Sequence, residues 1–581
     1  MKNKRGKIKN KKKQDKISTK SRRISEVLKG ILAGKYAIPR LQREFVWDGP
    51  RAAKLMDSIY KEMPIGTSLI WDTPKSKKLY LRQQYNVLPH FNEGNKRVWF
   101  LIDGQQRMSV LHGMHQGKTI INSKGKEINF RNIVFALEKR KKSFDKKKKS
   151  PDGKEIEQRF FYRKPQQGRY VSLGDILSPQ FNHHFNGLTK SNRNALNECR
   201  RRILNYKMVF ISTRMSNIDE IKECFLRINT LGMKVSSADA IFTNAQVLDL
   251  RDFAHEVRDC IGTPFKNIDE MPILWAMTAI QGQCYPGKNK IQASVKKLEK
   301  EAEDKDLLRK KLNKEWSLLK ECFRKSAVYL ENEFRVLSAN YLYSPYMLSM
   351  LALFHYFNNK KSPNQKQKKQ IRRWFWITTT ARSYSGQAFY KCIQYDSGFF
   401  KRLAKNDNAR FPLSADADFR EIRNTQYDKT KSGMGSSFYG LLFKKKPVSL
   451  LDDALNEIPL ERYLTPINKD RHHIFPRALL QKIGIKQTEY NSICNICLLT
   501  AEENKTIGNK HPSKYLKEAK RNKNLFAKKM SHHLIPSFDN NQGLWAKNIK
   551  KGFHNFIKER QILIKESLEK EAGIRLFRVD K

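Results

Sequence analysis

The chain has no long hydrophobic run. No segment approaches the roughly 18 consecutive apolar residues of a membrane-spanning helix. The N-terminus is charged and no apolar core follows it, which excludes a secretory signal. These absences predict a protein that has no membrane segment and works in the cytoplasm.

Cysteine is also scarce, with eight residues scattered over a chain of 581. This number excludes a disulfide framework and fits reduced thiols. Cys494 and Cys497 have the Cys-x-x-Cys spacing of half a zinc site, but the chain has no second such pair. Two buried apolar thiols are therefore the favoured interpretation, and a zinc site is the alternative.

Acidic residues are few relative to basic ones. The chain has 115 Lys and Arg against 57 Asp and Glu, which gives a formal charge of +58. Such an excess repels itself on folding unless a polyanion neutralises it. DNA or RNA is the first candidate partner. A ribosome-like structural role would also fit, and a general preference for lysine can account for part of the excess.

The length indicates several domains, and the patterns predict an α+β multidomain chain. Helical spacing of apolar residues begins at Ile24, and strands are expected at 66–71 and 98–102. Two basic runs, 1–20 and 139–151, are expected to be a disordered tail and an exposed loop; phosphate contact and simple solubility both remain open for the tail. Residues 426–447, rich in Gly, Ser and Lys, are expected to be a linker. The predicted domains are a basic tail (1–23), a mixed α/β domain (24–250), a mainly helical region (251–425) and a C-terminal domain (426–581).

Asp103, Gly104, Gln105, Gln106 and Arg107 stand between a buried strand and the start of a helix. Backbone amides at such a junction can converge on an anion, and Arg107 could fork onto a phosphate. Asp103 could hold a metal or a ribose hydroxyl, and either glutamine could orient water. In the alternative interpretation, Asp103 caps the helix and the other side chains are surface. The chain has no Gly-x-x-x-x-Gly-Lys-Ser/Thr motif, which excludes a P-loop enzyme.

A second constellation lies near the C-terminal end, where His472, His473 and Pro476 are followed by Asn495 and Asn504. Cutting a phosphodiester needs a group that takes a proton from water and a divalent cation that neutralises the charge on the phosphate. A histidine pair with two spaced amides can supply both. The sequence predicts a strand and turn at the histidines, a partner strand within 491–499, and a helix over 501–507 that brings Asn504 back.

Three N-terminal segments together resemble the first domain of the GmrSD, SspE and BrxU group of phage-defence proteins. They are Ile38–Trp47, Asp103–Arg107 and Phe225–Ser236, the last followed by Asp239. Members of this group join an Asp-Gly-Gln-Gln-Arg domain, related to the ParB/sulfiredoxin fold, to a C-terminal HNH domain. The resemblance covers roughly residues 24–250 and 370–520. It implies that the first domain binds and hydrolyses a nucleotide and senses modified DNA. The nucleotide site implied by motif match comprises Asp103, Gln105, Gln106 and Arg107, with Gln42, Arg43, Arg227 and Asn229 as companions.

The C-terminal pattern resembles the ββα-metal module of HNH nucleases, here set within helices. That family commonly has a metal-binding Asp before the general-base histidine, whereas this chain has His472. The resemblance implies that His473 is the general base and that Asn495 holds its ring in the working tautomer. It also implies that His472 and Asn504 are metal ligands, with a changed metal preference. Residues close by that could grip phosphate are Lys505, Lys510 and His511.

These patterns together predict an NTP-dependent, modification-sensing DNA endonuclease or nickase, similar to type IV restriction enzymes. The expected cofactors are Mg²⁺ or a similar divalent cation and an NTP, with GTP, UTP and ATP all open. The expected partners are double-stranded DNA, specifically modified phage DNA, and a second copy of the chain in a homo-oligomer. Two alternatives remain: a non-catalytic nucleic-acid-binding protein, and an NTPase regulator with a vestigial nuclease half.

Overall fold

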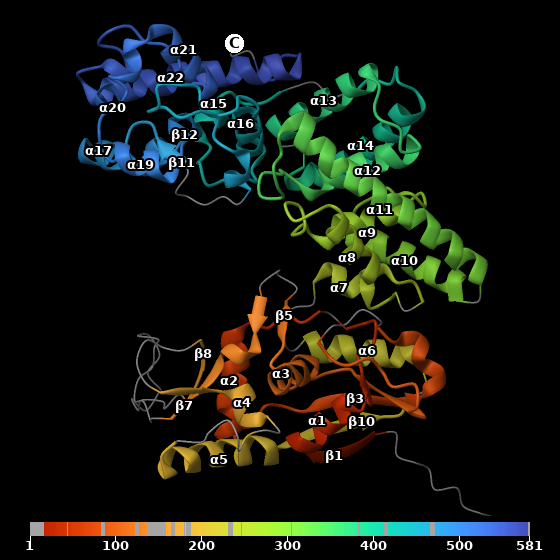
Figure 1. The fold of residues 1–581 in the computed structure, drawn as a ribbon. Helices are drawn as coiled ribbons and strands as arrows, with labels where there is room; N and C mark the ends of the chain where they lie inside the picture. The colour runs from red at the N-terminus through yellow and green to blue at the C-terminus, as the bar shows by residue number, and fades with distance from the viewer. Residues whose placement is uncertain are drawn as a thin grey trace, which may run out of the picture. The chain divides into compact units, whose positions relative to one another are not determined.

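The computed structural model divides into two compact units, residues 1–251 and 252–581 (Figure 1). The basic run 139–151 and the first sixteen residues lie outside the part of the chain that the structure describes. No described helix combines the length and the apolar character needed to cross a membrane. The described residues are 17–42, 44–82, 87–122, 127–137, 159–163, 169–178, 181, 188–215, 217–230, 236–245, 247–303, 305–381, 384–411, 416–464 and 471–578.

A five-stranded mixed sheet organises the first unit, with strand order β1-β10-β3-β4-β2. The β1–β10 and β3–β4 pairs are antiparallel, whereas β10–β3 and β2–β4 are parallel. The strands are β1 (Ile17–Arg23), β2 (Tyr36–Ala37), β3 (Ser68–Pro74), β4 (Arg97–Leu101) and β10 (Lys207–Thr213).

Strand β1 corrects the expectation that the tail extends to residue 23. It pairs along its whole length with β10, from Ile17 opposite Thr213 to Arg23 opposite Lys207. Six of its seven side chains are exposed, so it adds backbone hydrogen bonds at the sheet edge rather than apolar burial. A polar strand of this kind leaves no hydrophobic periodicity in the sequence.

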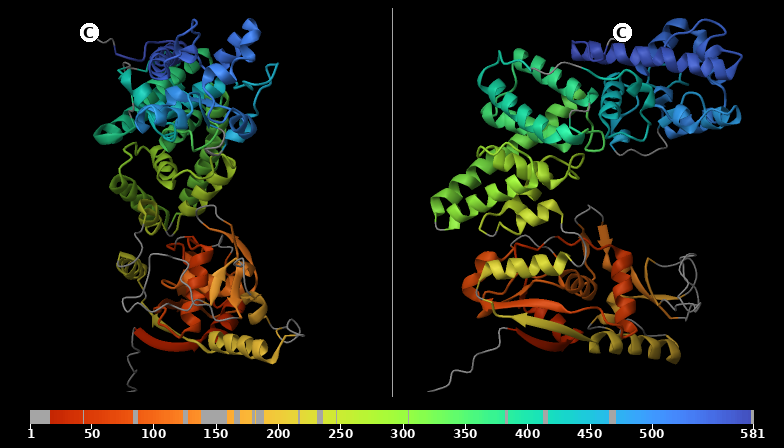
Figure 2. Two further views of the ribbon diagram at one scale, coloured as in Figure 1. Left: turned by 90° about the vertical axis from the view of Figure 1, so that its left-hand side faces the viewer. Right: turned by 180° about the vertical axis from the view of Figure 1, so that it is seen from behind.

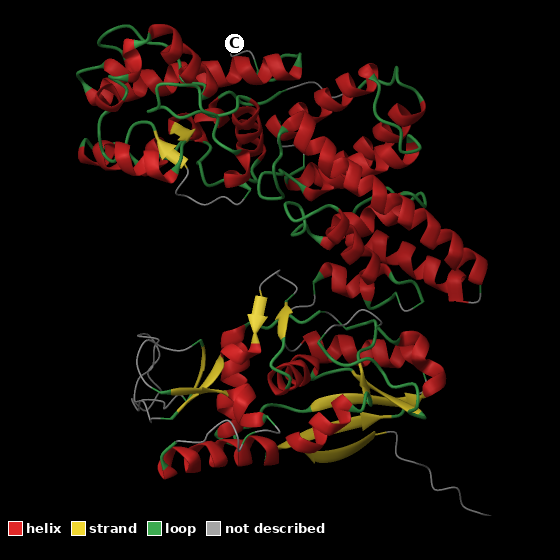
Figure 3. Ribbon diagram, in the orientation of Figure 1, coloured by secondary structure: helices red, strands yellow, loops and turns green. Residues whose placement is uncertain are grey.

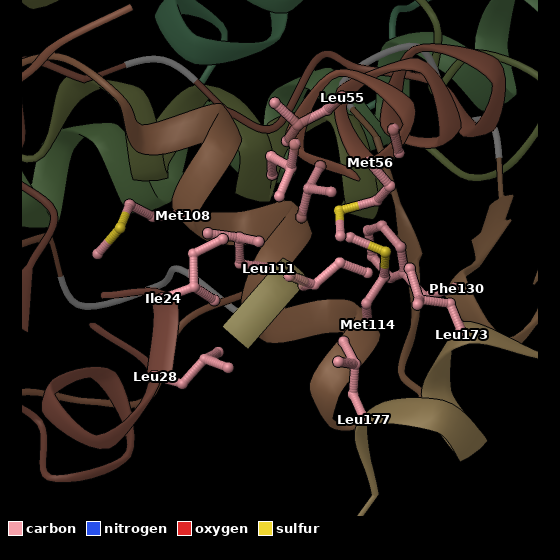
Figure 4. Packing of buried hydrophobic residues seen from close by; sticks show 14 of the residues in the cluster. Ile24, Leu28, Leu55, Met56, Met108, Leu111, Met114, Phe130, Leu173 and Leu177 are labelled. Carbon is pink, nitrogen blue, oxygen red and sulfur yellow. The ribbon is translucent and has the colours of Figure 1, made fainter. Parts of the chain in front are cut away.

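Apolar side chains cover both faces of the sheet. On one face, Ile70 and Leu101 pack with α1, α2 and α3, and Figure 4 shows Ile24, Met108 and Met114 in this core. On the other face, Trp71 and Phe100 pack with α6. The alternation along each strand explains both layers. The helices are α1 (Ile24–Leu32), α2 (Gly49–Tyr60), α3 (Gln105–His115), α6 (Ile218–Thr230) and α7 (Ser237–Phe242).

Two small antiparallel sheets and two helices complete the first unit. Figure 2 shows these elements from two further sides. They are β5 (Thr119–Ile121), β6 (Glu127–Asn129), β7 (Ile133–Ala136), β8 (Phe160–Tyr162), β9 (Tyr170–Ser172), α4 (Leu173–Leu177) and α5 (Lys190–Asn205).

The regular secondary structure of the second unit is almost entirely helical, with one described two-stranded sheet (Figure 3). The α+β class expected from the sequence is confirmed at this coarse level, whereas the ParB-like and HNH modules stay predictions. Its first helices are α8 (Leu250–Cys260, which begins in the first unit), α9 (Glu270–Ala279), α10 (Lys288–Glu303), α11 (Asp306–Phe334), α12 (Pro345–Phe357), α13 (Gln365–Thr380), α14 (Phe389–Lys405), α15 (Arg420–Asn424) and α16 (Gly433–Lys444).

Helix α16 corrects the expectation of a linker over 426–447. Eleven of its twelve residues, Gly433 to Phe443, are buried. Gly435 has no room for a Cβ, because the Lys429 carbonyl oxygen would lie 2.0 Å away, and a Cβ on Gly440 would meet the Phe334 oxygen at 2.8 Å. The small residues that suggest flexibility in the sequence therefore permit close helix packing.

The C-terminal part of this unit surrounds an antiparallel pair of three-residue strands, β11 (Arg471–His473) and β12 (Ile496–Leu498). Helix α19 begins and ends where the sequence predicts, at Ala501 and Ile507. The partner strand is shorter than the predicted 491–499, because a 3-10 turn occupies Ile493–Asn495. The remaining helices are α17 (Arg477–Lys482), α18 (Gln487–Tyr490), α20 (Pro512–Tyr515), α21 (Lys523–His532) and α22 (Ile549–Ala572).

One buried arginine ties this hairpin to α22. Arg560 is fully buried and donates to the carbonyl oxygens of Cys494 (2.9 Å), Ile496 (2.7 Å), His533 (2.8 Å) and Leu534 (2.9 Å). Burial lowers the pKa of the guanidinium to about 10, so it keeps its charge at neutral pH. The four carbonyls spread this charge and fix β12 against the helix.

We expect Arg560→Met to destabilise the second unit by more than about 3 kcal/mol, because it leaves four buried carbonyl oxygens without a donor. Calorimetry of the full chain would show the transition of that unit at a lower temperature. Lys570→Met, an exposed site on the same helix, is the control. Equal transition temperatures for the two variants would contradict the role given to Arg560.

Candidate functional site

The structure brings His472 and Asn504 together. His472 lies on β11, Asn504 lies on α19, and the imidazole Nδ1 is 2.8 Å from the amide Oδ1. The His472 ring is 2% exposed and packs edge-on against Tyr515, with 5.7 Å between ring centres. Burial lowers the pKa of His472 to about 4, so the ring is neutral at pH 7.

His473, the next residue on the strand, has different neighbours. Its Nε2 is 3.0 Å from Oδ1 of Asn491, and its ring meets that of Tyr427 edge-on at 5.2 Å. Burial lowers the pKa of His473 as well. The His473 ring is partly exposed, unlike that of His472. Neighbouring residues on a strand face opposite sides, which explains the different partners of the two imidazoles.

The sequence predicts that Asn495 holds the His473 ring, but the structure shows other partners for this side chain. Its side chain accepts from the Phe475 amide (2.9 Å) and donates to the carbonyls of Phe475 (3.1 Å) and Tyr490 (3.0 Å). The amide is fully buried, and it fixes the turn that follows the histidines. Asn491, which lies just before the 3-10 turn, meets the ring instead.

The donor set fits a divalent cation. In an octahedral shell with ligands about 2.1 Å from the ion, adjacent ligand atoms lie roughly 3 Å apart, close to the 2.8 Å between His472 Nδ1 and Asn504 Oδ1. A neutral imidazole is the form that binds metals. The described residues contain no group of three or more His, Cys, Asp or Glu that could hold an ion.

The predicted phosphate-binding residues Lys505, Lys510 and His511 line one recess, which we call the α19 recess. It has a volume of about 780 Å³ and is also lined by Lys514 and Lys547. Asn504, the partner of His472, directly precedes Lys505 on α19. The recess thus begins one residue after the partner of His472 on α19.

Cys494 and Cys497 are both fully buried free thiols, and burial raises their pKa values to about 11 and about 12. The burial expected of apolar thiols is therefore observed.

In the first unit, the side chains of Gln42 and Gln106, two residues of the predicted nucleotide site, form hydrogen bonds with the backbone. Gln42 is buried and donates to the carbonyls of Leu101 (2.9 Å) and Ile102 (2.6 Å) at the end of β4. Gln106 accepts from the Val46 amide (2.9 Å) and donates to the Glu44 carbonyl (3.0 Å). These bonds join the 38–47 segment to the turn after β4, so the motifs that are separate in sequence meet in space.

Arg107 and Asp103 form an ion pair one helical turn apart, with 2.9 Å between Nη2 and Oδ2. Arg107 also donates to the carbonyls of Ile65 (2.7 Å) and Thr67 (2.6 Å), and its side chain is 12% exposed. Asp103 therefore does not cap α3; the cap position is Gly104, whose φ of 90° suits glycine. The alternative of surface side chains at 105–107 is also wrong, since Gln105 is buried.

The remaining predicted residues of the nucleotide site are Arg227, Asn229 and Arg43. Arg227 lies on α6, pairs with Glu223 at 2.7 Å, and is 79% exposed. Asn229 lies on the same helix, and Arg43 lies outside the described residues.

Sequence reasoning missed Asn491, Tyr427 and Arg560. Asn491 could have been weighed as a second amide four residues before Asn495. Tyr427 and Arg560 are far away in the sequence, and no spacing rule links them to the histidines.

Comparison with known proteins gives two findings. An uncharacterized protein of Methanocaldococcus jannaschii is 23% identical over 95% of this chain and 99% of its own length. The family model described as the N-terminal domain of the GmrSD restriction endonuclease matches residues 24–246. This range contains four of the five strands of the sheet, Gln42, Gln106 and the Asp103–Arg107 pair. The match supports a GmrSD-like family for the N-terminal part of the chain.

Proposed function

We propose that this protein is a restriction-type DNA endonuclease in phage defence that cuts through the histidine pair of its second unit. The observation that carries the proposal is the 2.8 Å approach of His472 Nδ1 to Asn504 Oδ1, with His473 beside it. The match of residues 24–246 to a restriction endonuclease domain supports the same function. A purely binding protein would not need two neutral imidazoles, one of them buried against an amide oxygen.

In this proposal His473 is the general base. A neutral ring can accept a proton from water, and the lowered pKa keeps His473 neutral at pH 7. When Nε2–H donates to Asn491, the lone pair lies on Nδ1, which is then the atom that takes the proton. Tyr427 holds the other side of the ring.

His472 and Asn504 would hold a divalent cation, Mg²⁺ or a similar ion, which when bound would neutralise charge on the phosphate. The chain's own contribution is to place two neutral ligands with a fixed separation and to keep His472 deprotonated. The α19 recess adds lysines that grip the phosphates next to the cut.

For the first unit we propose nucleotide binding that senses modified DNA and licenses cutting, with GTP, UTP or ATP as the nucleotide. Asp103, Gln42, Gln106 and Arg107 form a hydrogen-bonded polar cluster around the end of β4. The carboxylate of Asp103, 39% exposed, and the exposed Arg227 are the groups of this set most available to a ligand.

We expect His473→Ala to reduce cleavage of phage DNA in the presence of Mg²⁺ by about 10²–10⁴-fold, because the proton acceptor is lost. DNA affinity and thermal stability should stay near those of the wild type. His90→Ala, an exposed histidine of the first unit, is the control. Cleavage that survives His473→Ala would show that another group accepts the proton.

We expect His472→Asp to raise cleavage with Mg²⁺ relative to cleavage with Ni²⁺, since carboxylates suit Mg²⁺ and imidazole suits Ni²⁺. Rates measured with each ion alone give the ratio. His472→Asn, which adds no charge, is the matched variant. An unchanged ratio for His472→Asp at retained activity would mean that residue 472 is not a ligand.

We expect Arg227→Ala to weaken nucleotide binding without a change in thermal stability, because this side chain is exposed. Arg107→Ala should lower the unfolding temperature of the first unit, because Arg107 binds two backbone carbonyls. Calorimetric titration with each NTP and thermal unfolding measure the two effects. Full nucleotide affinity in Arg227→Ala would remove this residue from the site.

A further inference from the structure

A second basic cavity lies on another side of the histidine pair. This cavity, which we call the α22 cleft, has a volume of about 1070 Å³ and lies against α15, α18 and α22. Arg423, Lys486 and Lys558 line it, and all three are exposed. The acidic residue in the lining, Glu489, is 3.3 Å from His554.

The three cations of the α22 cleft have no acidic partner within the described part of the chain. Many other basic residues of this unit are paired, such as Arg258 with Glu270 at 3.0 Å. Unpaired cations around an open cleft favour an anionic ligand. The amides of Gln426 and Gln487 in the same lining add hydrogen-bonding groups.

A short backbone ladder joins the α22 cleft to the His473 ring. The Tyr427 amide donates to the Asn491 carbonyl and the Ile493 amide to the Thr425 carbonyl, both at 2.9 Å. The residues that alternate with these, Gln426 and Ser492, form a bridge and line the cleft. Tyr427 and Asn491 instead contact His473. The cleft and the imidazole therefore lie on opposite faces of one ladder.

The α19 recess flanks the other imidazole. His472 contacts Asn504, and Lys505, the next residue, lines that recess. In Figure 1, α19 and α20 lie on one side of the β11–β12 hairpin and α15 on the other. The β11–β12 hairpin, which carries the histidine pair, therefore lies between the α19 recess and the α22 cleft.

We infer that one nucleic-acid strand runs from the α22 cleft, around the edge of the backbone ladder and past the histidine pair, into the α19 recess. Arg423 and Lys558 then hold phosphates on one side of the cut bond, and Lys510 and Lys514 hold phosphates on the other. This inference rests on the proposed nuclease function and adds the path of the substrate. Because all three cations of the cleft are exposed, a continuous strand can reach them from solvent.

The test measures duplex DNA binding by the full chain in EDTA, which prevents cutting, over a range of salt concentrations. Three double variants each remove two cations: Arg423→Ala/Lys558→Ala, Lys510→Ala/Lys514→Ala, and the control Lys310→Ala/Lys311→Ala. The control residues lie on α11, 75% and 69% exposed. The first two variants should bind more weakly and lower the salt slope by about two, at about 0.9 per phosphate contact. The control should change little.

Phosphate ethylation interference then maps the contacts. The α22-cleft variant and the α19-recess variant should lose interference on opposite sides of the bond that the wild type cuts. Loss on the same side, or an α22-cleft variant that binds like the control, would overturn the inference while the nuclease function stands. A wild type that binds but never cuts would instead refute the proposed function.

Discussion

The charge of one buried arginine holds the candidate site together. Arg560 reaches from α22 to four carbonyl oxygens, two of which belong to the turn and strand that follow Asn491. The contacts of His473 with Asn491 and of β11 with β12 both depend on that segment staying in place. A lysine could not span the same four acceptors, because it lacks the planar fork of guanidinium.

Burial lowers the pKa of Arg560 and of His472, but only the histidine loses its charge at neutral pH. A guanidinium keeps its proton even when desolvation lowers its pKa to about 10, whereas the same effect leaves His472 neutral with a pKa of about 4. The site thus combines a fixed positive charge, that of Arg560 on α22, with two neutral nitrogen bases, the imidazoles on β11. Such bases suit metal binding and proton transfer in a chain whose net charge is otherwise strongly positive.

Local patterns predicted much of this arrangement. An apolar run that ends in Asp103-Gly104 gave the strand, turn and helix, and the spacing to Asn504 gave its approach to His472. Two features escaped because their causes are not local: strand β1 pairs through its backbone, and the glycines of α16 serve close packing. The third, the contact of Asn491 rather than Asn495 with the ring, is local, but the sequence offers two amides four residues apart and spacing alone did not decide between them.

In the proposed mechanism, His472 and Asn504 share one divalent ion at the bond that is cut. The decisive experiment is a crystal structure of the His473→Ala chain with DNA and Mn²⁺, read by anomalous scattering. We expect an ion about 2–2.5 Å from both His472 Nδ1 and Asn504 Oδ1, touching a phosphate oxygen. An ion bound to that phosphate through other side chains, with the His472–Asn504 hydrogen bond intact, would contradict it.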